Sequence, residues 1–136
     1  MSTAEKAKEV VADSQFPPVG RRGFGSPFTH TIWGVAASEY LESANRDILV
    51  MVQIENREGV ENVQAIAAVD GVGQYLLYLN QHRIHRLTER LDVLFIGPYD
   101  LSISLGYPTP SPDPHPEVEI VIQRILKAAH ESQKKW

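Results

Sequence analysis

The chain has 136 residues, the length of one domain, and its 43% hydrophobic and 22% charged residues exclude a disordered, collagenous or coiled-coil protein. Without cysteine, it has no disulfide, thiolate metal site or cysteine nucleophile. Its net charge of -4, with scattered basic residues, argues against a nucleic-acid partner. No apolar run approaches the roughly 18 residues of a membrane span, and no signal peptide pattern is present. We therefore expect no membrane partner and a cytoplasmic location.

The first part of the chain predicts two helices separated by a long loop. A capping box at Ser2 and Glu5 begins a short helix that ends before Phe16-Pro17-Pro18. Residues 19–34 are rich in Gly, Pro, Ser and Thr, and we expect an irregular connection of the kind that often carries function. Residues 38–45 have the spacing of a second helix.

The rest of the chain predicts strands that alternate with helices. Residues 48–54 and 91–96 are continuous apolar runs, which are typical of parallel strands covered on both faces. Residues 57–69 have helical spacing, and Pro116 suits the first position of a last helix. One face of that last helix is apolar and carries Val118, Val121, Ile122, Ile125 and Ala129. The alternation predicts an α/β fold.

Two acidic residues follow the predicted strands. Glu55 comes directly after the first strand, where period-two alternation places it on the same face as Gln53, and Asp100 follows the second strand. Because α/β proteins place their sites at the carboxyl ends of parallel strands, two carboxylates there suit Mg²⁺, Mn²⁺ or a similar cation. The alternative is that one carboxylate caps a helix and the other pairs with a surface Lys or Arg, and spacing alone leaves both open.

Other motifs favour less specific roles. The turn at residues 97–102 would expose the N-H groups of a following helix to a substrate carboxylate, although Gly-Pro turns after strands are usually structural. Residues 20–25 match neither a phosphate loop nor a dinucleotide fingerprint. The five histidines show no metal-ligand spacing, and structural roles are expected for His30, His82, His85, His115 and His130.

In combination, several stretches resemble the metal-dependent 2-oxo acid aldolases of the HpcH/HpaI aldolase/citrate lyase family, which belong to the phosphoenolpyruvate/pyruvate-utilising (β/α)8 barrels. The matching stretches are Thr3-Ala4-Glu5-Lys6-Ala7, Phe16-Pro17-Pro18-x-Gly20-x-Arg22-Gly23-x-Gly25-Ser26, Tyr40-Leu41, Ala44-Asn45, Val52-Gln53-Ile54-Glu55, Phe95-Ile96-Gly97-Pro98-Tyr99-Asp100-Leu101-Ser102 and His115-Pro116-Glu117-Val118.

The resemblance implies a role for each matching residue. Glu55 and Asp100 correspond to the ligands of a divalent cation, which would be Mg²⁺, Mn²⁺ or Co²⁺. Gln53, Tyr99 and Asp100 correspond to substrate-binding positions, Tyr99 through its backbone N-H. The implied activity is that of a class II aldolase, a carbon-carbon lyase that cleaves or forms 4-hydroxy-2-oxo acids through a pyruvate enolate. The implied partners are pyruvate, an aldehyde and other copies of the chain in a homo-oligomer.

The resemblance also implies that parts of the barrel are missing. The family's general base His, its acidic partner and an active-site Arg would precede Met1, so no catalytic residue is assigned. A barrel of this kind needs about 250 residues and eight strands. We therefore expect residues 1–136 to be a single fragment of a barrel domain, truncated at both ends. The alternatives are an inactive remnant that only self-associates or binds a partner, and an intact relative with other lyase or hydrolase chemistry on ketoacids.

Residues 73–91 interrupt the family pattern. They show neither helical nor strand periodicity, and they lie where a loop of a few residues would suffice. Joining Val72 to Asp92 would restore the expected strand. The segment is in frame and short enough to be a retained intron of the fungal type, and a surface insertion is the alternative.

Overall fold

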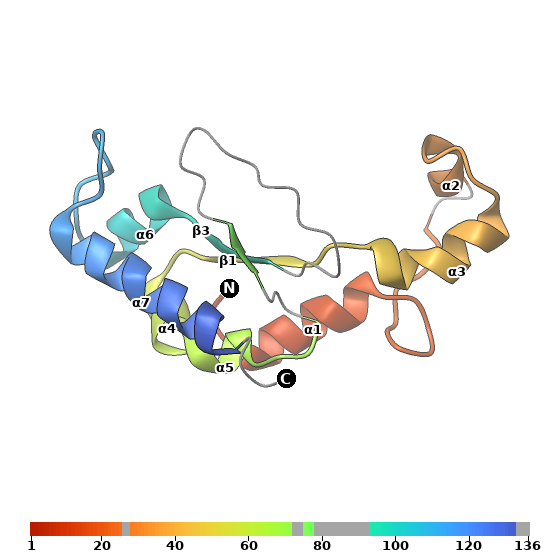
Figure 1. The fold of residues 1–136 in the computed structure, drawn as a ribbon, viewed down its shortest axis with the longest axis horizontal. Coiled ribbons are helices and arrows are strands. Elements are labelled where there is room, and N and C mark those ends of the chain that lie inside the picture. Colours follow the sequence, from red (N-terminus) through yellow and green to blue (C-terminus); the bar gives the residue numbers. More distant parts are fainter. Residues whose placement is uncertain (26–27, 72–74, 78–92, 133–136) are drawn as a thin grey trace.

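A computed structural model describes residues 1–25, 28–71, 75–77 and 93–132 of the chain (Figure 1). In chain order the elements are α1 (Ala4–Ser14), α2 (Thr29–Ile32), α3 (Ala37–Asp47), β1 (Met51–Ile54), α4 (Arg57–Glu61), α5 (Val63–Ala67), β2 (Tyr75–Leu77), β3 (Val93–Ile96), α6 (Pro98–Leu105) and α7 (Pro116–Ser132). Among the described helices, none has the length and apolar character that crossing a membrane requires.

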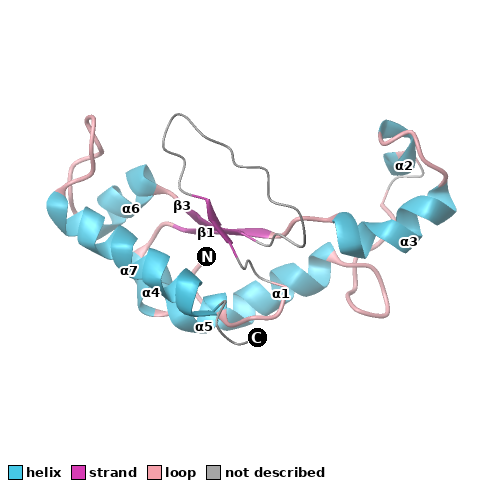
Figure 2. Cartoon of the chain, viewed as in Figure 1, coloured by secondary structure: helices cyan, strands magenta, loops and turns pink. Residues whose placement is uncertain are grey.

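The strands form one parallel sheet with the order β1-β3-β2 (Figure 2). Gln53 pairs with Phe95 and Ile54 with Ile96, while α4 and α5 lie between β1 and β2 in the chain. Because β1 and β3 are parallel and in register, their carboxyl ends lie together at one edge of the sheet. The predicted alternation of parallel strands and helices is confirmed.

Helices cover one face of the sheet. The side chains of Val52, Ile54, Leu94 and Ile96 are buried, and they join a core with residues of α1, α5 and α7. The prediction that residues 48–54 are covered on both faces is wrong for the described structure. Leu49 and Met51 are 46% and 48% exposed, and β1 begins only at Met51.

The predicted helices are present in the structure, and three details differ from the prediction. Thr3 rather than Ser2 is the N-cap of α1, since its hydroxyl accepts from Lys6 N at 3.2 Å. The single helix expected over 57–69 is two helices, α4 and α5, separated at Asn62, whose side chain donates to the Ser2 carbonyl. The loop expected over 19–34 contains the short helix α2.

The segment 73–91 contributes a third strand. The sequence shows no clean period there, and the structure has β2 paired with β3 in parallel, Tyr75 opposite Val93. The rest of that segment lies outside the described residues. This strand adds to the two that the sequence predicted at 48–54 and 91–96, and its periodicity gave no signal because backbone pairing with β3 requires no periodic pattern of side chains.

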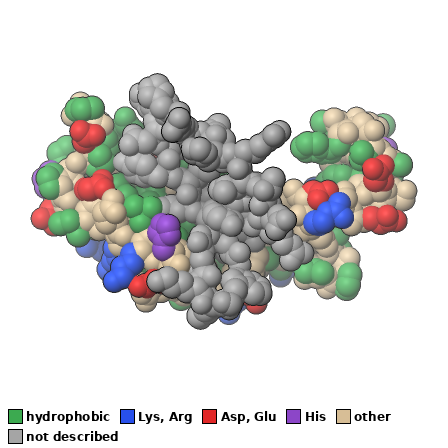
Figure 3. Space-filling model, viewed as in Figure 1, with side chains coloured by type: hydrophobic (Ala, Val, Ile, Leu, Met, Phe, Trp, Pro, Cys, Tyr) green, Lys and Arg blue, Asp and Glu red, His purple; other side chains and the backbone are tan. Residues whose placement is uncertain are grey.

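The helices α2 and α3 form an arm that projects from the sheet at the end opposite α6 and α7 (Figure 1). Its base is fastened by Asn45, whose side chain accepts from Phe16 N at 2.6 Å and donates to Phe16 O at 2.9 Å. The Arg22 guanidinium lies over the Phe16 ring and donates to the Tyr40 hydroxyl. Hydrophobic side chains are visible on the arm in Figure 3, and Ile32 is 82% exposed.

The glycine-rich stretch 20–25 lies in the chain between α1 and this arm. A Cβ at Gly20 would lie 2.3 Å from the Gln15 carbonyl oxygen, so only glycine fits against the end of α1. Beside it, Arg21 pairs with Asp13, and this hydrogen bond lowers the pKa of Asp13. These contacts give the stretch a packing role.

Candidate active site

The alternation of β1 directs Gln53 and Glu55 away from the core. Val52 and Ile54 are buried against the helices, so the residues between and after them belong to the opposite face. Gln53 and Glu55 are both partly buried there. The same-face placement that the sequence predicted for these two residues agrees with the burial pattern.

The helix α6 begins directly after β3. Gly97 is its N-cap and Pro98 its first residue, and Leu101 N donates to Gly97 O at 2.8 Å. Proline has no N-H, so the first amides of this helix are those of Tyr99 and Asp100. Both residues are exposed. The helix dipole favours an anion at this end.

The two strand ends meet at Gly97. Its N-H donates to Ile54 O at 3.3 Å, which continues the β1–β3 pairing by one residue. A Cβ at Gly97 would lie 2.3 Å from Gln53 Nε2 and 3.4 Å from Glu55 Cβ. Gln53, Glu55 and the start of α6 therefore form one group of adjacent residues at the carboxyl edge of the sheet.

Hydrogen bonds hold the chain that follows Glu55. Asn56 caps α4 by accepting from Gly59 N at 2.8 Å, and its amide donates to Ser2 Oγ at 3.2 Å. Arg57 N donates to Ser104 Oγ at 3.2 Å, which ties the start of α4 to α6. The turn that carries Glu55 is thus fixed both to the N-terminal segment and to the helix that carries Asp100.

Among the described residues, neither carboxylate has the role that the structural alternative gave it. The cap of α4 is Asn56 and not Glu55. The ion pairs of the described residues are Arg21–Asp13, Arg46–Asp47 and Lys127–Glu131, and neither Glu55 nor Asp100 takes part in them. The described residues also contain no cluster of three or more His, Asp or Glu side chains suited to a metal. Two carboxylates fit a hard cation that keeps water and substrate as its other ligands.

Two of the described histidines, His30 and His115, have structural contacts. His30 Nδ1 lies 2.9 Å from Val35 O in the arm, and α2 is at the opposite end of the molecule from α6 (Figure 1). His115 stacks on Tyr107 with 4.5 Å between ring centroids, and its carbonyl accepts from Val118 N at the start of α7. His82 and His85 lie outside the described residues. These contacts agree with the structural roles expected for His30 and His115.

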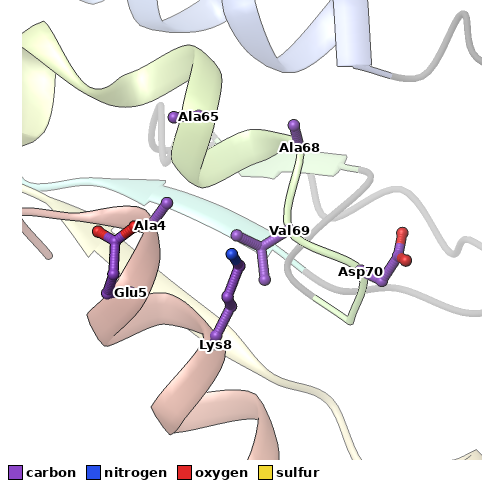
Figure 4. Close-up of a pocket in the computed structure, with 7 residues that line it drawn as sticks. All are labelled: Ala4, Glu5, Lys8, Ala65, Ala68, Val69 and Asp70. Atoms are coloured by element: carbon purple, nitrogen blue, oxygen red, sulfur yellow. The ribbon is translucent and has the colours of Figure 1, made fainter.

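A separate cavity of 590 Å³ lies between α1 and α5 (Figure 4). Small side chains form much of its wall, and the charged side chains of Glu5, Lys8 and Asp70 surround it. None of the residues predicted to bind metal or substrate lines it. This cavity is therefore distinct from the group around Gly97.

The sequence pattern of the family described as HpcH/HpaI aldolase/citrate lyase matches residues 1–135. The chain belongs to this family. It is 38% identical to a 2-keto-3-deoxy-L-rhamnonate aldolase of Klebsiella pneumoniae over 79% of this chain and 33% of that protein. It is also 38% identical to a hydroxypyruvate/pyruvate aldolase of Chromohalobacter salexigens, over 98% of this chain and 44% of that protein.

A solved structure of the HpcH/HpaI family shares the fold. It is the family protein of Burkholderia cenocepacia, with a TM-score of 0.71 and 30% identity over 98% of this chain and 45% of that chain. The chain thus spans between a third and a half of the length of these relatives. The family resemblance inferred from the sequence motifs is confirmed, and the curated relatives are lyases of the aldolase type.

The contact of Gly97 with the Gln53 side chain was not foreseen. The sequence shows a glycine after a strand, which predicts close approach of some neighbour but does not identify it. The partner follows from the register of β1 and β3, in which Gln53 is opposite Phe95.

Proposed function

We propose that this chain carries the metal-binding and 2-oxo acid-binding part of a class II aldolase site, on a partial (β/α)8 barrel formed by residues 1–136. The observation that supports the proposal most directly is the meeting of Gln53, Glu55 and the α6 N-terminus at Gly97. Parallel strands with helices on one face and functional residues at the carboxyl ends are the arrangement found in such barrels. The activity would be the cleavage of 4-hydroxy-2-oxo acids to pyruvate and an aldehyde, or the reverse condensation.

Each residue of the group has a role in this proposal. Glu55 and Asp100 would hold Mg²⁺, Mn²⁺ or Co²⁺, and the cation would supply Lewis-acid stabilisation of the charge that develops on the substrate oxygens. The amides of Tyr99 and Asp100 donate to the substrate carboxylate at the positive end of α6. The Gln53 amide donates to a substrate oxygen. No residue of the chain is assigned as the general base.

Deuterium exchange at C3 of pyruvate tests the proposal. In D₂O with Mn²⁺, a buffer or solvent base takes a proton from C3 and a solvent deuteron replaces it, so mass spectrometry follows the reaction without an aldehyde. Because the chain lacks an assigned general base, we expect it to be a poor aldolase whose wild type accelerates exchange only slowly, and we expect Glu55→Gln and Asp100→Asn each to lower that rate at least tenfold. Glu58→Gln, at an exposed position of α4, is the matched control and should leave the rate unchanged. Equal rates for wild type and Glu55→Gln would contradict the proposal.

The alternative function is a non-catalytic remnant that only self-associates or binds a partner. The exposed side chains of Phe28, Ile32 and Trp33 on the arm favour it, since they offer apolar surface for association. Sedimentation velocity on the samples used for exchange separates the two functions. Oligomers without any exchange in the wild type would favour the remnant, whereas exchange that depends on Asp100 would favour the aldolase.

A further inference from the structure

Gly97 is not required by its backbone conformation. Its φ of -97° lies in the region that any residue adopts, unlike the left-handed φ of 85° at Gly106, which ends α6. The reason for a glycine at position 97 must therefore be steric. The atom in its way is Gln53 Nε2, only 2.3 Å from where a Cβ would lie.

Other glycines of the chain show how specific this contact is. At Gly20 and Gly59, the nearest atoms to a Cβ are the backbone carbonyl oxygens of Gln15 and Met1, so substitution would displace the main chain. At Gly23 nothing lies within 4 Å of a Cβ. At Gly97 the nearest atom is the end of a flexible side chain, which can move without unfolding the strand.

We infer that Gly97 is a positioning residue, which leaves the space in which the Gln53 amide lies across the β1–β3 pair beside Glu55. A side chain at position 97 would push this amide out of the group while leaving the Glu55 and Asp100 carboxylates on their own segments. The consequence for substrate rests on the proposed function. Gly97 then controls binding of the 2-oxo acid through the orientation of the Gln53 donor.

The direct test measures the position of the amide. The side-chain NH₂ resonances of Gln53, identified by their loss in Gln53→Ala, are followed by NMR in Gly97→Ala and in the control Gly23→Ala. We expect them to shift in Gly97→Ala and to stay in place in Gly23→Ala. Unchanged Gln53 resonances in Gly97→Ala would overturn the inference. If Gly97→Ala alone fails to fold, recovery of folding in Gln53→Ala/Gly97→Ala supports the contact, and failure of both variants overturns it.

The pyruvate exchange assay adds the functional readout. In Gly97→Ala we expect the KM for pyruvate to rise about tenfold, as for the loss of one hydrogen bond, with kcat nearly unchanged. In a Gln53→Ala background, adding Gly97→Ala should change nothing further, because the group it displaces is already gone. The same rise in both backgrounds would overturn the inference. If the Gln53 resonances shift but neither variant alters exchange, the contact stands and the proposed substrate role of Gln53 fails.

Discussion

Asn45 illustrates how a single side chain can join two segments that are distant in the sequence. Its amide group satisfies both the N-H and the C=O of Phe16, 29 residues earlier, and so connects the end of α1 to the end of α3. Both groups are partly buried, so water replaces these bonds only in part. The position of the arm at the entry to β1 depends on this contact.

Replacing Asn45 by Ala should therefore destabilise the chain. Two polar backbone groups would lose their partner, and we expect the free energy of unfolding to fall by about 1–3 kcal/mol. Urea denaturation followed by circular dichroism measures this. Gln64→Ala, at an exposed position of α5, is the control and should stay within about 0.5 kcal/mol of the wild type. A loss in Asn45→Ala no larger than in the control would show that the contact does not fasten the arm.

At the scale of residues, the sequence identified candidate site residues better than it identified the contacts between side chains. Glu55 and Asp100 could be singled out because each follows an apolar run, and the structure places their segments side by side. The Asn45–Phe16 and Gly97–Gln53 contacts could not be predicted. They depend on the strand register, the path of the loop and the side-chain rotamer. None of these produces a periodic pattern of residues in the sequence.

Among the elements, α7 is the one whose sequence pattern predicts its packing most directly. Of the five residues on its predicted apolar face, Val121 is partly buried and the other four are at most 1% exposed, namely Val118, Ile122, Ile125 and Ala129. His115 accepts from backbone N-H groups at the start of the helix, and Pro116 begins it. Packing against α5 and α6 then places this helix against the sheet.

Two isoleucines of α7 allow a matched test of this packing. Ile122 is fully buried and Ile120 is 63% exposed on the same helix. Truncation of Ile122 to Ala removes apolar contacts and leaves a cavity, so we expect a loss of about 2–5 kcal/mol in the free energy of unfolding. Ile120→Ala should cost less than about 0.5 kcal/mol. Equal losses in urea denaturation would mean that α7 does not pack on the core as the structure shows.

The elements that the sequence predicted well are those with a full amphipathic pattern. The ends of α1 and α3 and the start of α7 lie within two residues of the predictions. The strands are shorter than their apolar runs, because β1 pairs only over the four residues Met51–Ile54. The break between α4 and α5 was missed, since apolar spacing continues through Asn62.

For the molecule as a whole, the β1–α4–α5–β3 unit carries the proposed site. Its strands pair directly with each other, and every residue of the group around Gly97 belongs to this unit or to α6. β2 pairs only with the other edge of β3. Residues 73–91, whether a retained intron or an insertion, therefore pair through β2 with the edge of β3 that faces away from β1, and the β1–β3 pairing does not involve them.

Deletion of residues 73–91 should consequently preserve the fold of this unit. Tyr75 lies opposite Val93, the first residue of β3, at the spacing of neighbouring strands, about 4.8 Å. Tyr75 is only four residues after Gly71, so the chain already comes close to the start of β3 at this point. Joining Val72 to Asp92 leaves six residues between Ala67 and Val93, within the usual range of about 2–6 for such loops. We expect the shortened chain to unfold cooperatively and to bind Mn²⁺ as the full chain does.

Mn²⁺ titration followed by electron paramagnetic resonance checks this expectation, with Glu55→Gln in the shortened chain as the control for binding at the proposed site. If the shortened chain loses cooperative unfolding while the full chain keeps it, the strand at Tyr75–Leu77 is needed to protect the edge of β3. If both chains fold and bind alike, pairing at that edge is dispensable. The chemistry of the site then depends on the register of β1 and β3 alone, because that register determines where Gln53, Glu55 and the start of α6 meet.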